Sequence, residues 1–370
     1  MMRWMLLSLM LLVFSPVAAQ VTAQTCATPE IQLRTADFTP GGIILTTFDR
    51  SSLWVYDIER NARYPLPDTV PCGSNCHLSR DGRWLTYYNL QDYTFGKMRV
   101  DGTQRTPLVR DATEVSWWSA DTLLIWTPEQ RPYLQLETGG EPEFFDQNGI
   151  ISVQPGGRYG VTMRPIGPNF ARYVTALDNP AAIPTALGLY VRYFSTMGWS
   201  PDGSWLAFTA PVIEGDTPNS TELYGIRPGD EQPTQWTTLT ADYGNVRING
   251  QLPGSLSWSP DGTRLAFWVM PLSGDDPEAD AGAATLHVFN LNTGETRAYC
   301  GYTTTEHTPN PPRLVWSPDS THIAFGGNLP GDDKGYLLLA LNIDTGLFTE
   351  LSNGIYPALG TADVIAWGVR

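Results

Sequence analysis

Short apolar runs separated by turn residues recur along the whole chain, and three of them nearly superimpose. They read WSPDGSWLAF at 199–208, WSPDGTRLAF at 258–267 and WSPDSTHIAF at 316–325. In each segment an aromatic residue ends one apolar run, a Ser-Pro-Asp turn follows, and Leu-Ala-Phe or Ile-Ala-Phe begins the next run. Looser copies lie at 78–87, 118–126 and 153–161. The pattern predicts repeated units that each open with a strand, a tight turn and a second strand.

The aspartates of these repeats are predicted to be structural turn residues. Ser-Pro-Asp-Gly suits a type I turn, because proline fixes φ at the second position and glycine relieves the steric cost of positive φ at the fourth. A catalytic or calcium-binding role is the alternative. The residues concerned are Asp81, Asp121, Asp202, Asp261 and Asp319.

A second turn signal follows most copies, and it completes the repeated unit. It reads Asp101-Gly102, Thr138-Gly139, Pro228-Gly229, Thr293-Gly294 and Thr345-Gly346. Each pair lies between short β-patterned runs, as in a hairpin. The unit is therefore strand A, turn, strand B, loop, strand C, turn and strand D. At about fifty residues this is the size of one propeller blade with variable loops.

The two ends of the chain are predicted to build one blade together. The terminal run 364–367 aligns with 255–258 and reads as an innermost strand A, while 42–48, 53–58 and 62–66 supply strands B, C and D. Such closure removes free sheet edges. We expect an all-β fold, a single β-propeller of seven four-stranded blades over 41–370, with six or eight blades as the alternatives.

These repeats resemble those of the TolB-like, or WD-repeat-like, β-propeller family, whose units carry the same aromatic-Ser-Pro-Asp-Gly-x-x-Ile/Leu-Ala-Phe signature. The resemblance extends from about residue 40 to residue 370 and implies the fold. It does not imply one function, because such blades occur in envelope scaffolds and in the gating propellers of prolyl-oligopeptidase-like peptidases. We expect neither the α/β domain of TolB nor a hydrolase domain in this chain, so neither activity is carried over.

The first residues have the pattern of a secretory signal. Arg3 precedes an apolar run at 5–14, and small residues at Val17 and Ala19 suit cleavage after Ala19. We therefore predict a signal peptide at 1–19, an N-terminal tail at 20–40 and an exported protein, periplasmic or extracellular. The apolar run is too short to span a bilayer, so stable membrane insertion is not expected.

Charge excludes one class of partner. Lys and Arg number 23 against 38 Asp and Glu, which gives a net charge of −15, and no basic stripe occurs along the chain. A nucleic acid needs clustered cations, so it is not expected as a partner. A basic protein or a divalent cation remains compatible with this charge. Like charges on the surface favour a monomer.

The four cysteines of an exported chain favour disulfide bonds. Three connectivities are open. Cys72 and Cys76 are close in a turn-rich segment, so their pairing is our first choice, and Cys26 with Cys300 then remains. A zinc half-site is the alternative, but no second pair of comparable spacing accompanies it.

Strand alternation places the A–B and C–D turns on one face of the ring and the B–C and D–A loops on the other. The B–C loops at 211–220, 271–283 and 328–334 and the D–A connections at 241–253 and 301–312 are long. Long loops on a rigid scaffold usually carry binding. The B–C loops hold the predicted binding residues, namely Glu214, Asp216, Asp275, Asp276, Glu278, Asp280, Asp332 and Asp333.

The run at 275–280 offers oxygen ligands at short spacing, so calcium is an alternative to a solvated acidic loop. It lacks the full EF-hand pattern, and no cofactor is predicted. The histidines His77, His287, His307 and His322 are scattered, and no GxSxG, HExxH or P-loop motif occurs. We therefore predict no catalytic residue.

The prediction is a non-catalytic, exported scaffold that binds a protein or peptide through its acidic loop face. The alternative is a propeller enzyme, a hydrolase or lyase of polysaccharide or lactone type with calcium assistance.

Overall fold

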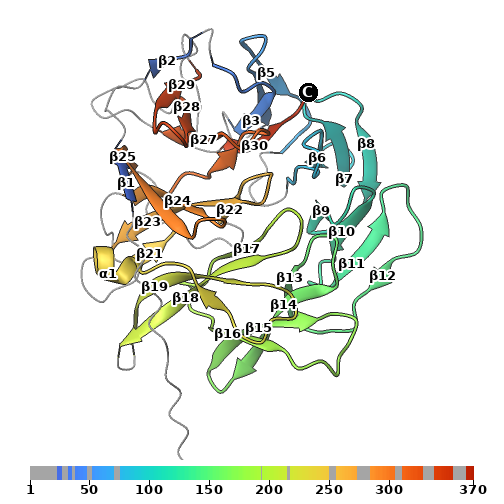
Figure 1. Ribbon diagram of the computed structural model, residues 1–370. Helices are drawn as coiled ribbons and strands as arrows, with labels where there is room; N and C mark the ends of the chain where they lie inside the picture. Colours follow the sequence, from blue (N-terminus) through green and yellow to red (C-terminus); the bar gives the residue numbers. More distant parts are fainter. Residues whose placement is uncertain are drawn as a thin grey trace, which may run out of the picture.

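The computed structural model describes residues 23–26, 32–35, 38–47, 52–70, 76–192, 194–214, 217–249, 256–272, 284–304, 311–327, 337–352 and 364–370. Their strands form seven sheets that follow one another around the molecule in chain order, with antiparallel pairing except for two parallel edge strands (Figure 1). The predicted signal peptide, 1–19, lies outside the described residues.

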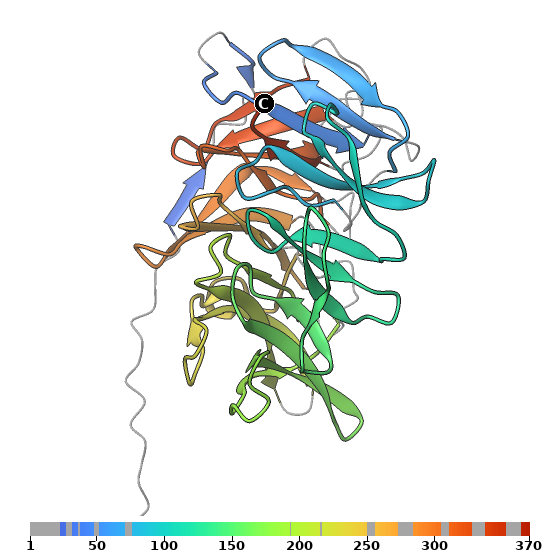
Figure 2. The ribbon, with the colours of Figure 1, turned by 90° about the vertical axis from the view of Figure 1, so that its right-hand side faces the viewer.

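The first blade is built from both ends of the chain. Its strand order is β30 (Val364–Gly368), β3 (Ile43–Thr47), β4 (Leu53–Asp57) and β5 (Ala62–Leu66). Figures 1 and 2 both show the red C-terminal strand β30 beside the blue strand β3. The Trp367 indole N–H donates to the Gly41 carbonyl at 2.9 Å, and the Arg370 guanidinium lies 3.0 Å from the buried Asp57 carboxylate. The predicted closure by the C-terminal strand is confirmed.

Blades 2, 3 and 4 follow without interruption. In blade 2, a Leu78–Leu85 bridge stands in place of a longer inner strand. The strands of blade 2 are β6 (Trp84–Asn89), β7 (Thr94–Arg99) and β8 (Thr106–Val109). Those of blade 3 are β9 (Glu114–Trp117), β10 (Thr122–Trp126), β11 (Pro132–Leu136) and β12 (Glu143–Phe144). Those of blade 4 are β13 (Ile150–Val153), β14 (Tyr159–Ile166), β15 (Asn169–Ala176) and β16 (Thr185–Leu189).

Blades 5, 6 and 7 contain the three closely similar repeats. Blade 5 comprises β17 (Met197–Trp199), β18 (Leu206–Glu214), β19 (Thr217–Ile226) and β20 (Thr234–Gln235). Blade 6 comprises β22 (Ser257–Trp258), β23 (Arg264–Pro271), β24 (Ala284–Asn290) and β25 (Glu295–Thr304). Blade 7 comprises β26 (Val315–Trp316), β27 (His322–Gly327), β28 (Leu337–Asn342) and β29 (Phe348–Glu350).

The predicted N-terminal tail, 20–40, contributes two strands to the ring. Strand β1 (Ala23–Cys26) pairs in parallel with β25, and β2 (Gln32–Leu33) pairs in parallel with β29. These pairings cover the outer edges of blades 6 and 7, where unpaired backbone groups would otherwise face solvent. Strands this short have no alternation that a sequence pattern could reveal.

Two segments predicted as irregular loops are regular in the structure. The predicted B–C loop 211–220 is mostly an extension of the β18–β19 hairpin, which remains paired out to Glu214 and Thr217. The predicted D–A connection 241–253 holds the end of helix α1 (Leu239–Tyr243) and strand β21 (Val246–Ile248), which pairs with the outer part of β23. The Glu222 carboxylate accepts the backbone N–H groups of Leu239 and Thr240, both at 2.8 Å, and so satisfies the start of this helix.

The core lies between neighbouring blades. Strands that face another sheet on both sides need apolar side chains at successive positions, which explains the continuous Leu-Ala-Phe and Ile-Ala-Phe runs. Between blades 6 and 7, for example, Trp268 and Phe325 are both buried and meet edge to face, with ring centroids 5.6 Å apart. The repeat thus supplies each inter-blade layer with its own apolar cluster.

Candidate functional site

Each Ser-Pro-Asp turn is closed by its own aspartate. In blade 5, Asp202 Oδ1 accepts the Ser200 hydroxyl at 2.6 Å, the Ser204 N–H at 3.0 Å and the Ser204 hydroxyl at 2.8 Å. Burial raises the pKa of Asp202, but these hydrogen bonds outweigh it and hold the pKa below its ordinary value. Turns centred on the other repeat aspartates show the same serine-to-aspartate bond, at Asp81, Asp121, Asp261 and Asp319. In all five turns the carboxylate therefore accepts hydrogen bonds from the turn itself.

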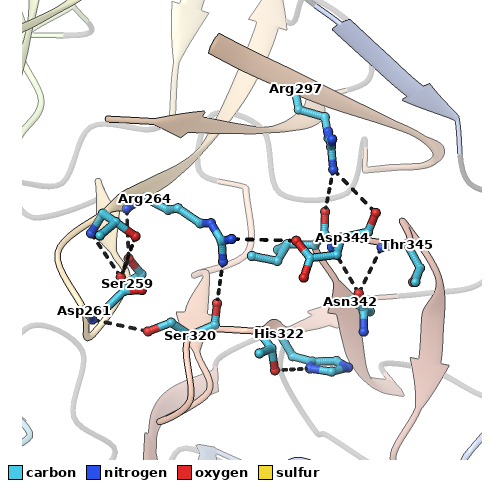
Figure 3. Close-up of polar contacts among 12 residues, drawn as sticks. Ser259, Asp261, Arg264, Arg297, Ser320, His322, Asn342, Asp344 and Thr345 are labelled. Carbon is cyan, nitrogen blue, oxygen red and sulfur yellow. Dashed lines mark hydrogen bonds and ion pairs between the residues drawn. The ribbon is translucent and has the colours of Figure 1, made fainter. Parts of the chain in front are cut away.

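The turns of blades 6 and 7 are also bonded to each other (Figure 3). Arg264 donates to the Ser320 carbonyl at 3.1 Å and lies 3.7 Å from the Asp344 carboxylate. Ser320 takes the positive φ that glycine holds in the other close copies, +60°, and its hydroxyl accepts the Asp261 N–H at 3.2 Å. Arg297 donates to the Ile343 carbonyl at 3.1 Å. These hydrogen bonds join the turns of blades 6 and 7 to one another. The whole face of the ring that carries the A–B and C–D turns is hereafter called the turn face.

The opposite face, hereafter the loop face, carries the longer connections. Most of the predicted acidic binding residues lie outside the described residues: Asp216, Asp275, Asp276, Glu278, Asp280, Asp332 and Asp333. Glu214 ends strand β18, but its side chain is outside the described part. That these acidic residues lie close to one another therefore stays a prediction.

Apolar side chains reach solvent where blade 4 meets the loop face. Ile166 and Phe170 flank the turn of the β14–β15 hairpin and are 48% and 46% exposed. The Tyr190 N–H donates to the Phe170 carbonyl at 2.8 Å, which brings a third exposed apolar residue to this rim. Exposed apolar groups clustered on a rim are a feature of interaction surfaces. Sequence patterns did not reveal them because blade 4 has the most degenerate repeat.

A buried arginine next to this rim was also missed. Arg172 is fully buried in β15 and donates from Nη2 to the Thr209 carbonyl of blade 5 at 2.7 Å. Its Nε and Nη1 have no hydrogen-bond partner among the described residues, and its guanidinium lies over the Phe208 ring at 5.7 Å. Burial lowers the pKa of Arg172 to about 10, so the group remains charged at neutral pH.

The described histidines are in three different settings. His77 Nε2 lies 3.0 Å from the Glu114 carboxylate, between blades 2 and 3. His322 is buried in blade 7, and burial lowers its pKa. His287 is fully buried in β24, and burial lowers its pKa to about 4. His307 lies outside the described residues, so no two histidines are seen to share a site in the described part of the chain.

The cysteines are only partly within the described residues. Cys76 is buried against blades 1 and 2 and is disulfide-bonded, while its predicted partner Cys72 lies outside the described part. The parallel pairing of β1 with β25 sets Cys26 directly opposite Cys300. Adjacent strands lie about 4.8 Å apart, which is within the Cα separation that a disulfide spans. The Cys26–Cys300 bond remains a prediction that this register favours.

Two grooves lie beside blade 2. One, of about 340 Å³, is on the turn face between blades 2 and 3, and Trp84, Lys97, Trp117 and Glu137 are among its lining residues. The other, of about 260 Å³, has a mainly polar lining that includes Asp68, Tyr87, Asp92 and Arg105.

Among the residues that the structure describes, no group of three or more His, Cys, Asp or Glu side chains is placed to hold a metal ion. None of the described helices is long and apolar enough to cross a membrane.

Seven blades, one of them closed by a strand from the opposite end of the chain, define a seven-bladed β-propeller. No protein-family model and no curated protein sequence matches the chain. Among solved structures, the chain is similar to a puromycin-hydrolyzing peptidase of Mycobacterium tuberculosis, with a TM-score of 0.52 and 14% identity over 90% of this chain and 56% of that one.

Two further solved structures are similar to this chain. The β-propeller domain of the Trilobed protease from Pyrococcus furiosus matches with a TM-score of 0.51 and 10% identity, over 85% of this chain and 93% of that one. TolB from Acinetobacter baumannii matches with a TM-score of 0.45 and 16% identity, over 88% and 82%. TolB structures are thus among the matches, as the repeats predicted. At these identities the likeness establishes the fold, and function rests on the surfaces described above.

Proposed function

We propose that the protein is an exported, non-catalytic scaffold that binds a protein or peptide through its loop face. The contrast between the two faces carries the proposal. On the turn face, the polar groups of short turns bond one another. The Asp202 carboxylate accepts the Ser200 hydroxyl within one turn, and Arg264 donates to the Ser320 carbonyl of the next blade. On the loop face, the β18–β19 hairpin stays paired out to Glu214 and Thr217, and the sequence predicts long connections at 271–283 and 328–334. Long loops on a folded scaffold are where binding most often occurs.

The chemistry of the loop face favours a cationic partner with some apolar surface. The net charge is −15, and the hairpin end at 211–220 together with the connections at 271–283 and 328–334 holds eight acidic residues, with Lys334 as the only cation in these segments. Complementary charge accelerates encounter and selects partners. The exposed Ile166 and Phe170 at the rim add apolar area that such a contact would bury.

Neutralising the acidic loop tests the proposal. In the variant D275N/D276N/E278Q/D280N, capture of cross-linked proteins from the native envelope or culture medium should fall by about tenfold, because four of the attractive charges are gone. Added salt should weaken capture by the unmodified protein in the same direction. Partners are identified and counted by mass spectrometry.

The matched control removes four acidic charges from the turn face. Glu141, Asp178, Glu231 and Glu295 are all exposed and follow C strands in blades 3, 4, 5 and 6. The variant E141Q/D178N/E231Q/E295Q should retain capture. Equal losses in the two variants would mean that net charge alone, and not the loop face, attracts the partner, and the proposal would be wrong.

No observation in the described part of the chain favours the alternative, a propeller enzyme of the hydrolase or lyase type, as the two faces favour binding. The similar Mycobacterium tuberculosis protein is a peptidase, but this chain spans only 56% of that protein. Of the described histidines, His287 is buried beyond reach of a substrate and His77 faces Glu114 at 3.0 Å. The binding role is therefore the better-supported proposal.

A further inference from the structure

A groove lies between blades 2 and 3 on the turn face. At the equivalent position between blades 5 and 6, aromatic side chains fill the space. We call the groove between blades 2 and 3 the Trp84 groove, and its lining is Ser79, Arg80, Asp81, Trp84, Lys97, Trp117, Ala120 and Glu137. Its volume of about 340 Å³ falls within the range of small-molecule sites. It lies on the turn face, away from the acidic loops, and does not depend on the proposed function.

A comparison of equivalent positions shows why this groove stays open. Trp84 in blade 2 matches Trp205 in blade 5, since each stands two residues after the glycine of a Ser-x-Asp-Gly turn, Trp84 as the first residue of β6 and Trp205 immediately before β18. Two residues after each tryptophan, Thr86 pairs with Lys97 in blade 2, and Ala207 pairs with Gly225 in blade 5. Lys97 and Gly225 therefore occupy equivalent positions in strand C.

In blade 5 the absence of a side chain at Gly225 admits Trp236. A Cβ at Gly225 would lie 1.7 Å from the Trp236 ring, which is only 7% exposed. That ring meets Trp205 edge to face at 5.4 Å and stacks on Phe289 of blade 6 at 4.8 Å. The layer between blades 5 and 6 is therefore sealed by an aromatic plug.

In blade 2 the same space is bordered by a polar side chain. The Lys97 ammonium lies 4.9 Å from the centre of the Trp84 ring and forms an ion pair with Glu137 of blade 3. Arg99 lies 5.3 Å from the same ring. Trp84 thus lines a groove instead of meeting a second aromatic residue, and Trp117 lines the blade 3 side.

The lining chemistry narrows the ligand to a neutral, hydroxyl-rich molecule. Two cations, Arg80 and Lys97, balance two acids, Asp81 and Glu137, so the groove has no net formal charge. A cationic ligand would meet Lys97 and Arg99 already placed over the Trp84 ring, and an anionic ligand would compete with Glu137 for Lys97. Indole rings beside donors and acceptors suit a sugar, which has an apolar C–H face and hydroxyl groups at its edge.

From these observations we propose that the Trp84 groove binds one neutral hexose unit of a glycan. The part of the Trp84 ring that lines the groove and is left uncovered by Lys97 and Arg99 contacts the C–H face of the sugar, and Glu137 and Lys97 bond its hydroxyl groups. Trp117 forms the opposite wall.

The test measures binding of defined sugars to the full chain by tryptophan fluorescence and by saturation-transfer NMR. The probes are maltose, cellobiose, lactose and N,N′-diacetylchitobiose, with glucuronic acid and glucosamine as charged comparisons. At least one neutral disaccharide should bind saturably at about 10 mM or below, and the two charged sugars should bind more weakly. Trp84→Leu should weaken binding about fivefold to tenfold, because the stacking surface is lost.

Trp205→Leu is the matched control, since it makes the same change at the plugged position and should leave affinity unchanged. Glu137→Gln keeps the side-chain shape and removes the charge, so it should weaken binding even if Trp84→Leu does not fold. No saturable signal from any neutral sugar would overturn the proposal. Equal loss in the Trp84 and Trp205 variants, or preference for a charged sugar, would also overturn it.

Discussion

At the residue scale, the repeat aspartates show how one side chain holds a local structure. In the blade 6 turn, Asp261 accepts from the Ser259 hydroxyl at 2.5 Å and from the Thr263 N–H at 3.0 Å. Burial raises the pKa of this carboxyl, but the hydrogen bonds lower it by more, so the pKa lies below its ordinary value. Stability from such a group is present above the unfolded-state pKa and is lost as the pH falls through the folded-state pKa.

A second residue makes stability depend on pH in the mildly acidic range. His287 Nδ1 lies 2.9 Å from the Thr285 carbonyl, and Nε2 lies 3.1 Å from the Tyr243 hydroxyl. A neutral ring that donates from Nδ1 and accepts at Nε2 satisfies both contacts. Burial lowers the pKa from 6.5 to about 4, so between these values the unfolded chain binds more protons than the folded one.

The free energy of unfolding should therefore decrease as the pH drops from about 6.5 to about 4. The variant His287→Gln lacks this titration and should show a shallower decrease, whatever its stability at neutral pH. Urea denaturation at about pH 7 and about pH 4.5 measures both slopes. An unchanged slope in the variant would show that His287 is not the group responsible.

At the element scale, the aromatic plug accounts for a difference between otherwise similar blades. Gly225 has no positive φ, so its requirement for glycine comes from the space that Trp236 fills. Gly225→Ala should lower the free energy of unfolding by about 1–3 kcal/mol, the usual cost of overpacking. Chemical denaturation is the measurement.

A double-mutant cycle identifies the contact responsible for that loss. Gly225→Ala made in a Trp236→Leu background should cost clearly less, because the ring that would clash is gone. Additive losses would show that Gly225 is required for another reason. The cycle also tests the inference about the groove, since it depends on Trp236 sealing the layer that stays open beside Trp84.

Sequence pattern predicted the elements that repeat and missed those that do not. The Ser-Pro-Asp turns, the hairpins and the closure by 364–367 each have a recurring signature. Helix α1 has five residues and β2 has two, lengths too short for any periodicity to show. The Trp84 groove was missed because it depends on two neighbouring blades, whereas a repeat describes one blade at a time.

At the scale of the whole molecule, closure of the ring fixes the positions of the two faces. Strand β30 pairs with β3, and Arg370 bonds Asp57, so the first blade is held by both ends of the chain. Strands β1 and β2 add outer edges to blades 6 and 7. A rigid ring of this kind presents its loops without an entropic cost for their relative placement at each binding event. This supports a binding role for the face that carries the longer connections.

The most direct test of that role compares one probe at two places on blade 4. Phe170, 46% exposed, lies at the loop face, and Ile183, 95% exposed, follows strand C on the turn side. A photo-reactive benzoylphenylalanine replaces one residue at a time, and the protein is irradiated in its native envelope or medium. We expect a discrete protein adduct from position 170 that the D275N/D276N/E278Q/D280N substitutions abolish, and none from position 183. An adduct from position 183 alone, or equal adducts from both positions, would contradict the binding role of the loop face.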